Sequence, residues 1–168
     1  MTSLRFLAAA GAVVLLAGCS SGPSAPAPTA AAPSAPCDAT ALASHAGVAA
    51  GVMTTYVWRP FRKGLLEQGA AGRATTVRRA RAAAHRIDAE LSAVTTVQGC
   101  TTSLSVSSAL TTGSALARSV EAQLTKGTVD AQAIGGLNSA VTTVVQQARE
   151  TGTAVRVTVP TPAELTVG

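Results

Sequence analysis

A chain of 168 residues that is 47% hydrophobic but only 2% aromatic has room for one modest domain. Charged residues make up 12% of the sequence, and the formal net charge is +5. This composition excludes a core built on aromatic side chains, so any core must come mostly from alanine and valine.

Residues 1–18 have the features of a signal peptide. Arg5 gives a positive start, and an apolar run follows from Phe6 to Leu16. An apolar stretch this short that ends in small residues is typical of a secretory signal rather than a membrane-spanning helix. We therefore expect export from the cytoplasm, which makes nucleic acid a poor candidate partner.

The signal ends in Leu16-Ala17-Gly18-Cys19, which resembles the lipobox of bacterial lipoproteins. This resemblance implies that Cys19 becomes the first mature residue and carries a lipid, with acyl chains such as palmitate at the outer face of the cell membrane. Ordinary secretion, with Cys19 free or paired, is the alternative. The Ala- and Thr-rich composition, with eleven arginines to two lysines, is similar to that of small envelope lipoproteins of actinobacteria.

Residues 20–36, which follow the lipobox, form a predicted linker rich in Pro and Ala. This segment has no large apolar side chains for a core, and its prolines favour extended polyproline II. At about 3.1 Å per residue it could span about 50 Å. We therefore expect residues 19–36 to be a disordered tether that begins with the lipidated cysteine.

Residues 37–152 are predicted to form an all-α domain. Apolar residues recur in steps of three and four along four segments, which places them on one face of each helix. Short connections should make consecutive helices antiparallel, as in an up-down-up-down four-helix bundle. The core-facing positions, helix by helix, are Leu42, Ala46, Ala49, Met53 and Tyr56 or Val57; Val77, Ala80, Ala84, Ile87, Leu91 and Val94; Val106, Leu110, Gly113, Ala117, Val120 and Leu124; and Ile134, Leu137, Val141, Val144 and Ala148.

Capping and breaking residues mark the predicted helix boundaries. Asp38 can cap the first helix, whose regular backbone should end before Pro60. Gly99 should end the second helix, and Gly127 should separate the third from the fourth. The tail, residues 153–168, alternates valine with polar residues and contains prolines, which suits an extended strap or a disordered end.

Three cysteines are an odd number for an exported chain. If Cys19 carries lipid, Cys37 and Cys100 remain as a pair in a compartment that permits disulfides. These two residues precede the first predicted helix and follow the second, so an antiparallel hairpin would bring them to the same end. A bond between them should stabilise the fold by roughly 4 kcal/mol in the chain-entropy model.

The sequence contains no constellation of residues for catalysis or metal binding. His45 and His85 lie at different heights of the predicted hairpin and lack a second ligand at helical spacing, so we interpret both as isolated surface residues. Asp88 and Glu90 are two apart on a helix and should point in different directions, so paired-carboxylate chemistry is not supported. We therefore expect a protein that is not an enzyme and has no cofactor.

Between positions 59 and 86, eight basic residues accompany one acidic residue, Glu67. Phosphate groups of envelope lipids or of anionic wall polymers would suit such a segment. The favoured reading is that the arginines coat the exposed face of the second helix. The basic residues are Arg59, Arg62, Lys63, Arg73, Arg78, Arg79, Arg81 and Arg86.

The turn between the first and second helices holds all aromatic residues after the signal, Tyr56, Trp58 and Phe61. An aromatic lid over the Ala-rich bundle is the favoured reading, because we expect no other large side chains to close that end. A contact tip is the alternative. The candidate binding residues are Trp58, Arg59, Phe61, Arg62, Lys63, Arg78 and Arg79.

Two functions are compatible with these features. The first is a membrane-anchored, non-enzymatic adaptor or binding module of the cell envelope, whose basic tip meets an anionic polymer, a lipid headgroup or an envelope protein. The second is a small carrier of an apolar ligand within the bundle. An enclosed cavity on the order of a few hundred Å³ would favour the carrier, and a solid core would favour the adaptor.

Overall fold

The computed structural model describes residues 37–97 and 104–166. The predicted signal, lipidated cysteine and linker lie outside these ranges. Within them every regular element is a helix. The elements are α1 (Ala39–Val52), η1 (Met53–Trp58), α2 (Arg59–Arg62), α3 (Arg73–Thr96), α4 (Leu104–Thr125), α5 (Ala131–Glu150) and η2 (Glu164–Thr166).

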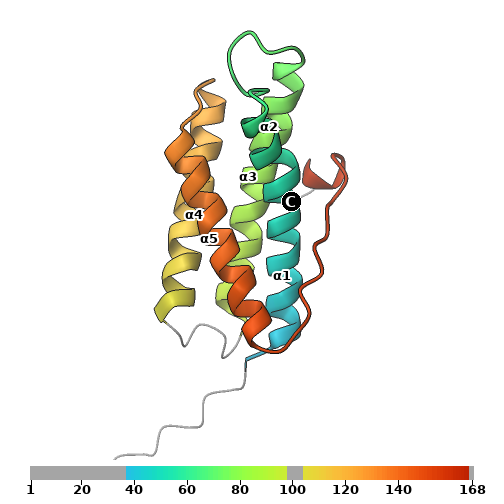
Figure 1. The fold of residues 1–168 in the computed structure, drawn as a ribbon, viewed down its shortest axis with the longest axis vertical. Helices are drawn as coiled ribbons and strands as arrows, with labels where there is room; N and C mark the ends of the chain where they lie inside the picture. The colour runs from blue at the N-terminus through green and yellow to red at the C-terminus, as the bar shows by residue number, and fades with distance from the viewer. Residues whose placement is uncertain (1–36, 98–103, 167–168) are drawn as a thin grey trace, which may run out of the picture. The chain divides into compact units, whose positions relative to one another are not determined.

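The four long helices form a bundle in which neighbours alternate in direction (Figure 1). α1 packs on α3 and α5, and α4 packs on the same two helices from the other side. Asp38 caps α1 by accepting a hydrogen bond from the Ala41 amide, at 3.0 Å. Gly127, with a φ of 73°, lies in the turn between α4 and α5. The prediction of an all-helical bundle is confirmed for the described residues.

The core follows the predicted stripes closely. Nearly all of the predicted positions are buried, and at the end of the first stripe the buried residue is Val57 while Tyr56 is half-buried. Val77 is also only half-buried. Gly113 of α4 lets that helix approach α3, because a Cβ there would lie 2.7 Å from the Leu91 Cδ1 atom. Small side chains therefore allow close helix packing where large ones are scarce.

The first α-helix ends at Val52, before Pro60 as predicted, but the helical path does not stop there. Proline lacks an N–H and crowds the carbonyl four residues earlier, which normally breaks an α-helix. Here the backbone widens into the π-helical segment η1, where the Arg59 amide donates to the carbonyl of Thr54, five residues earlier. The wider turn accommodates the proline, so the helical path continues through α2 to Arg62.

After α5 the tail runs as an extended strap along α1, residues 153–161 (Figure 1, red). The Thr158 amide donates to the Gly47 carbonyl at 3.2 Å. The carbonyl oxygens of Arg156 and Thr158 lie directly against Gly47 and Gly51, so that a Cβ on either glycine would collide with the strap backbone. The two glycines therefore allow the backbone of the strap to pack directly on α1.

The far end of the strap is fastened by side chains. The Tyr56 hydroxyl donates to the Pro160 carbonyl at 2.6 Å. The Thr161 amide donates to the Glu164 carboxylate at 2.6 Å, an arrangement like the capping box that begins many helices. Leu165, in the helical turn that follows, is buried. The tail is thus part of the packed domain.

Cys37 lies directly before α1, and Val97 directly follows α3. Both pack against the core cluster, and both helix ends lie at the same end of the bundle (Figure 1). Cys100 is outside the described residues, so the Cys37–Cys100 disulfide stays a prediction.

Candidate functional site

The candidate site lies at the end of the bundle formed by η1, α2 and the loop that follows. Arg59, Arg62 and Lys63 are exposed there, and Trp58 and Phe61 are half-buried against the core. The Arg62 guanidinium carbon lies 5.8 Å from the centre of the Trp58 ring, within the range of a cation–π contact. We call these five residues the basic tip.

The aromatic rings close this end of the bundle only in part. The Trp58 and Phe61 ring centroids are 5.9 Å apart, and both rings keep some exposure to solvent. Leu66 is buried, with 1% of its surface exposed, whereas the adjacent Leu65 is 36% exposed. The expectation that no other large side chain is present here is therefore wrong, because Leu66 is also buried in the core at this end.

The cations of the basic tip have no acidic partner in the described part of the chain. Each ion pair among the described residues includes a side chain of α3. Glu90 pairs with Arg86 at 2.6 Å and Asp88 pairs with Arg118 at 3.1 Å. Positions 59, 62 and 63 are three and four apart, so the three charges lie on one side of the helix. Like charges at this spacing repel each other. The helix dipole favours positive charge at a helix C-terminus, which offsets part of this repulsion.

The rest of the basic segment divides between structural and exposed roles. Arg73 joins two loops by donating to the carbonyls of Leu66 and Gly127, at 2.9 and 2.8 Å. Arg78 and Arg79 are exposed, but they line a groove against the turn at the end of the strap. The structure therefore groups five of the seven predicted binding residues in the tip and sets these two apart.

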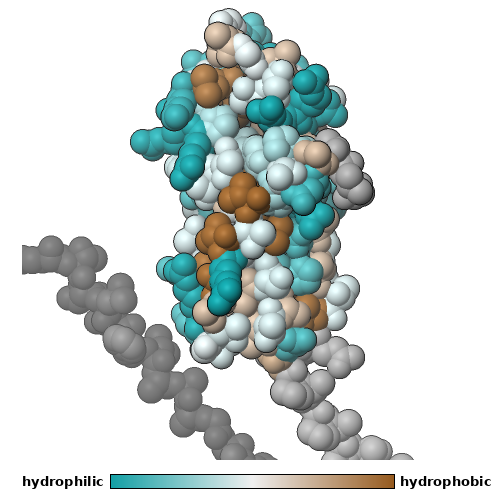
Figure 2. All heavy atoms as spheres, turned by 90° about the vertical axis from the view of Figure 1, so that its right-hand side faces the viewer, coloured by the Kyte–Doolittle hydropathy of each residue, from teal (hydrophilic) through white to brown (hydrophobic). Residues whose placement is uncertain are grey.

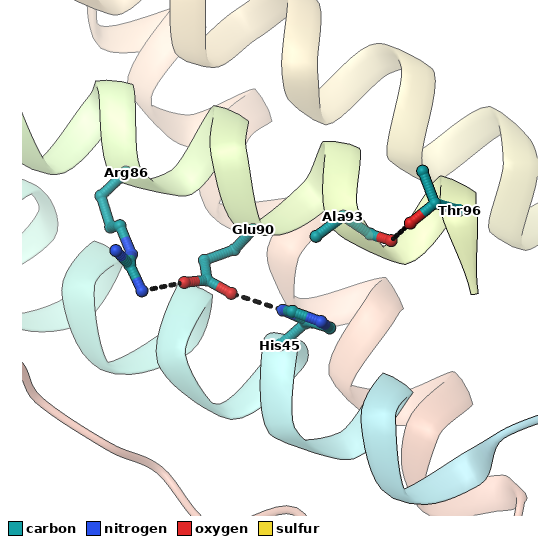
Figure 3. Close-up of polar contacts among 5 residues, drawn as sticks. All are labelled: His45, Arg86, Glu90, Ala93 and Thr96. Carbon is teal, nitrogen blue, oxygen red and sulfur yellow. Dashed lines mark hydrogen bonds and ion pairs between the residues drawn. The ribbon is translucent and has the colours of Figure 1, made fainter. Parts of the chain in front are cut away.

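A polar network joins α1 to α3 (Figure 3), nearer the end of the bundle at which α1 starts and α3 ends. His45 Nδ1 lies 2.7 Å from a carboxylate oxygen of the buried Glu90, whose other oxygen contacts Arg86. The prediction that His45 is an isolated surface residue is wrong. The expectation that Asp88 and Glu90 point in different directions is confirmed, since Asp88 contacts Arg118 of α4.

A second candidate site is an open groove of about 740 Å³ between α1, α3 and the strap. Its walls include the apolar residues Val48, Val159 and Pro160, together with Arg86 and Glu164. Figure 2 shows the strap side of the domain, where hydrophobic residues gather in the middle among hydrophilic ones. Sequence analysis missed this groove, because it depends on where the tail packs.

The carboxyl group of Glu164 is the titratable group whose environment shifts its pKa most clearly. Hydrogen bonds from the amide and side chain of Thr161 lower this pKa, and the charge of Arg86 lowers it further. The ionised form is therefore favoured by the folded strap. The Glu164 carboxylate stabilises the turn at the end of the strap through its hydrogen bond with the Thr161 amide.

Among the described helices, none combines the length and the apolar composition needed to cross a membrane. The described residues also contain no cluster of three or more His, Cys, Asp or Glu side chains suited to a metal ion. No known family model, curated protein or solved structure matches this chain.

Proposed function

We propose that this protein is a membrane-anchored, non-enzymatic adaptor of the cell envelope that binds an anionic component through its basic tip. One observation carries the proposal: Arg59, Arg62 and Lys63 are exposed on one side of a helix beside Trp58. No described acidic side chain pairs with them, whereas the acidic residues of α3 are paired. A bound anion would relieve the repulsion among the three cations.

The anchor in this proposal is Cys19, on the strength of its lipobox. Replacing Cys19 by Ala should release the protein into the medium or leave an unprocessed precursor, as seen by fractionation and mass spectrometry. A Cys19→Ala variant that fractionates and migrates like the parent would refute the anchor while leaving the basic tip untouched.

Binding of the full chain to immobilised polyphosphate tests the tip. We expect salt-sensitive binding of the parent and a loss of about tenfold or more in R59S/R62S, since each charge-assisted contact is worth about 1.5–3 kcal/mol. The matched control is R149S/R156S, which removes the same net charge from exposed positions on α5 and the strap. Equal losses in the two variants would indicate attraction by net charge alone, and no loss in R59S/R62S would contradict the proposal.

A carrier of an apolar ligand is the second candidate, and the groove beside the strap is the observation that favours it. The buried side chains of the four helices form one cluster, which supports the adaptor over a carrier that holds its ligand inside the bundle. A neutral apolar dye, Nile red, should therefore give no saturable fluorescence with the parent. Saturable binding that is lost in Val48→Asp would favour the carrier instead.

A further inference from the structure

The basic tip carries apolar surface as well as charge. Among the described residues the large hydrophobic side chains with the greatest exposure are Leu65, Val157 and Val159, and the first of these directly follows the tip. The rings of Trp58 and Phe61 are also partly exposed. Three cations without an acidic partner among the described residues and three partly exposed apolar side chains thus lie within the eight positions from 58 to 65.

This combination distinguishes between kinds of anionic partner. A hydrophilic anionic polymer offers charge to the arginines but no apolar phase to Leu65 and the rings. A bilayer surface offers both, because lipid phosphates lie next to acyl chains and tryptophan is enriched at that level. We propose that the basic tip docks on a bilayer rich in anionic headgroups, an inference that rests on the function proposed above.

The predicted tether is long enough for the tip to reach the membrane that holds the anchor. The helical path from α1 through α2 is about 36 Å long at 1.5 Å per residue. The tip lies at the far end of this path from Cys37. A Pro/Ala linker that spans about 50 Å can therefore extend past the bundle and let the tip turn back to the same bilayer.

Trp58 is the single tryptophan of the chain, so its fluorescence reports on the tip alone. The full chain would be incorporated into vesicles of phosphatidylcholine, with or without anionic phosphatidylglycerol. We expect a blue shift of Trp58 emission, and quenching by brominated acyl chains, only in the anionic vesicles, with both effects reversed by high salt. Because the anchor is present in both vesicles, the difference measures docking of the tip.

Variants separate the charged from the apolar contribution. R59S/R62S/K63S should weaken docking by roughly 100-fold, since each basic residue near an anionic surface contributes about fivefold. Leu65→Ser should reduce quenching without any change in charge, and Val157→Ser, at an exposed position of the strap, should not. Equal quenching in Leu65→Ser and the parent would remove the apolar part of the argument and overturn the proposal.

Two outcomes distinguish this inference from the proposed function. If Trp58 is unaffected by anionic vesicles while polyphosphate still binds the tip, the partner is a soluble polymer and only the membrane inference fails. If neither vesicles nor polyphosphate engage the tip, both proposals fail. Equal quenching in neutral vesicles would mean that headgroup charge does not drive docking, and would also overturn the inference.

Discussion

Two carboxylates on neighbouring helices differ in burial, and burial changes how much a contact with a basic side chain affects stability. Glu90 is buried and contacts both Arg86 and His45 within 2.7 Å. Glu121 lies 3.7 Å from His85, and both of these side chains are at least one-third exposed. Water competes for the exposed pair but is largely excluded from Glu90, so the two pairs should differ in their effect on stability.

We predict that Glu90→Gln lowers the free energy of unfolding by about 1–3 kcal/mol, because the side-chain amide has one acceptor oxygen where the carboxylate has two, and cannot keep the contacts with both Arg86 and His45. Glu121→Gln, the matched control, should change it by less than about 0.5 kcal/mol. Urea denaturation followed by circular dichroism measures both values. Equal effects of the two substitutions would show that the network does not stabilise the junction of α1 and α3.

Adjacent leucines test what closes the tip end of the bundle. Leu66→Ala should cost about 2–5 kcal/mol because it leaves a cavity in a packed core. Leu65→Ala, one position away and exposed, should cost little. Thermal unfolding compares the two variants, and a Leu66→Ala variant that melts with the parent would return the closing role to the aromatic rings.

At this scale the sequence predicts buried positions well and specific partners poorly. Positions such as Leu110 and Ile134 follow from helical periodicity, which is a local property. The contact of His45 with Glu90 joins residues that are 45 positions apart. Nothing near His45 in the sequence indicates it, because it depends on the rotation of α1 against α3.

At the scale of elements, the strap and α1 fit each other through their repeats. Two extended residues advance about 6.6 Å, and four helical residues advance about 6 Å. Alternate strap carbonyls, those of Arg156 and Thr158, can therefore meet glycines spaced four apart on the helix. The pair Gly47 and Gly51 is thus explained by the close approach of another backbone.

We predict opposite effects for two Gly→Ala substitutions on helices. Gly51→Ala forces a methyl group into the Thr158 carbonyl and should lower stability by about 1–3 kcal/mol. Gly135→Ala, on α5 with nothing within 4 Å, should raise it by up to about 1 kcal/mol through helix propensity. Hydrogen exchange of the Thr158 amide should accelerate only in Gly51→Ala. Unchanged exchange in that variant would contradict the close packing of the strap on α1.

Helix boundaries show where element-level rules succeed and where they fail. The cap at Asp38 and the break at Gly127 follow from local chemistry and are confirmed. The regular α-helix does end before Pro60, but the continuation of the helical path through the proline was not predicted, because a π-helical turn accommodates it and such turns have no simple sequence signature. The turn after the strap did have a sequence signal, since Thr161 and Glu164 have the spacing of a capping box and Pro162 directly follows Thr161, which is where proline is favoured at the start of a helical turn.

For the whole molecule, we predict a disulfide between Cys37 and Cys100. The start of α1, which Cys37 directly precedes, and the end of α3 lie at one end of the bundle (Figure 1), which favours the close approach that such a bond requires. Mass spectrometry of unreduced peptides should find the crosslink, and reduction should lower the melting temperature as the denatured chain gains freedom. Two free thiols in protein isolated from the envelope would exclude the bond.

The bundle could be predicted from the sequence because short connections and four apolar stripes leave few arrangements. The binding partner could not be predicted, because a basic segment indicates that the partner is negatively charged but says nothing about its shape. The structure narrows the candidate residues within that segment, since Arg73 and Arg86 bond to other residues of the domain, while the tip cations have no acidic partner in the described part of the chain. Exposed charge and partial aromatic exposure then give the site that we propose.

The most direct test of the basic tip is to map amide chemical shifts by NMR while polyphosphate is added to the isotope-labelled full chain. We predict that the largest changes fall between Trp58 and Leu65, saturate with added ligand and disappear in R59S/R62S/K63S. Changes centred on Val48 and the strap, or changes spread evenly over the exposed arginines, would contradict the account.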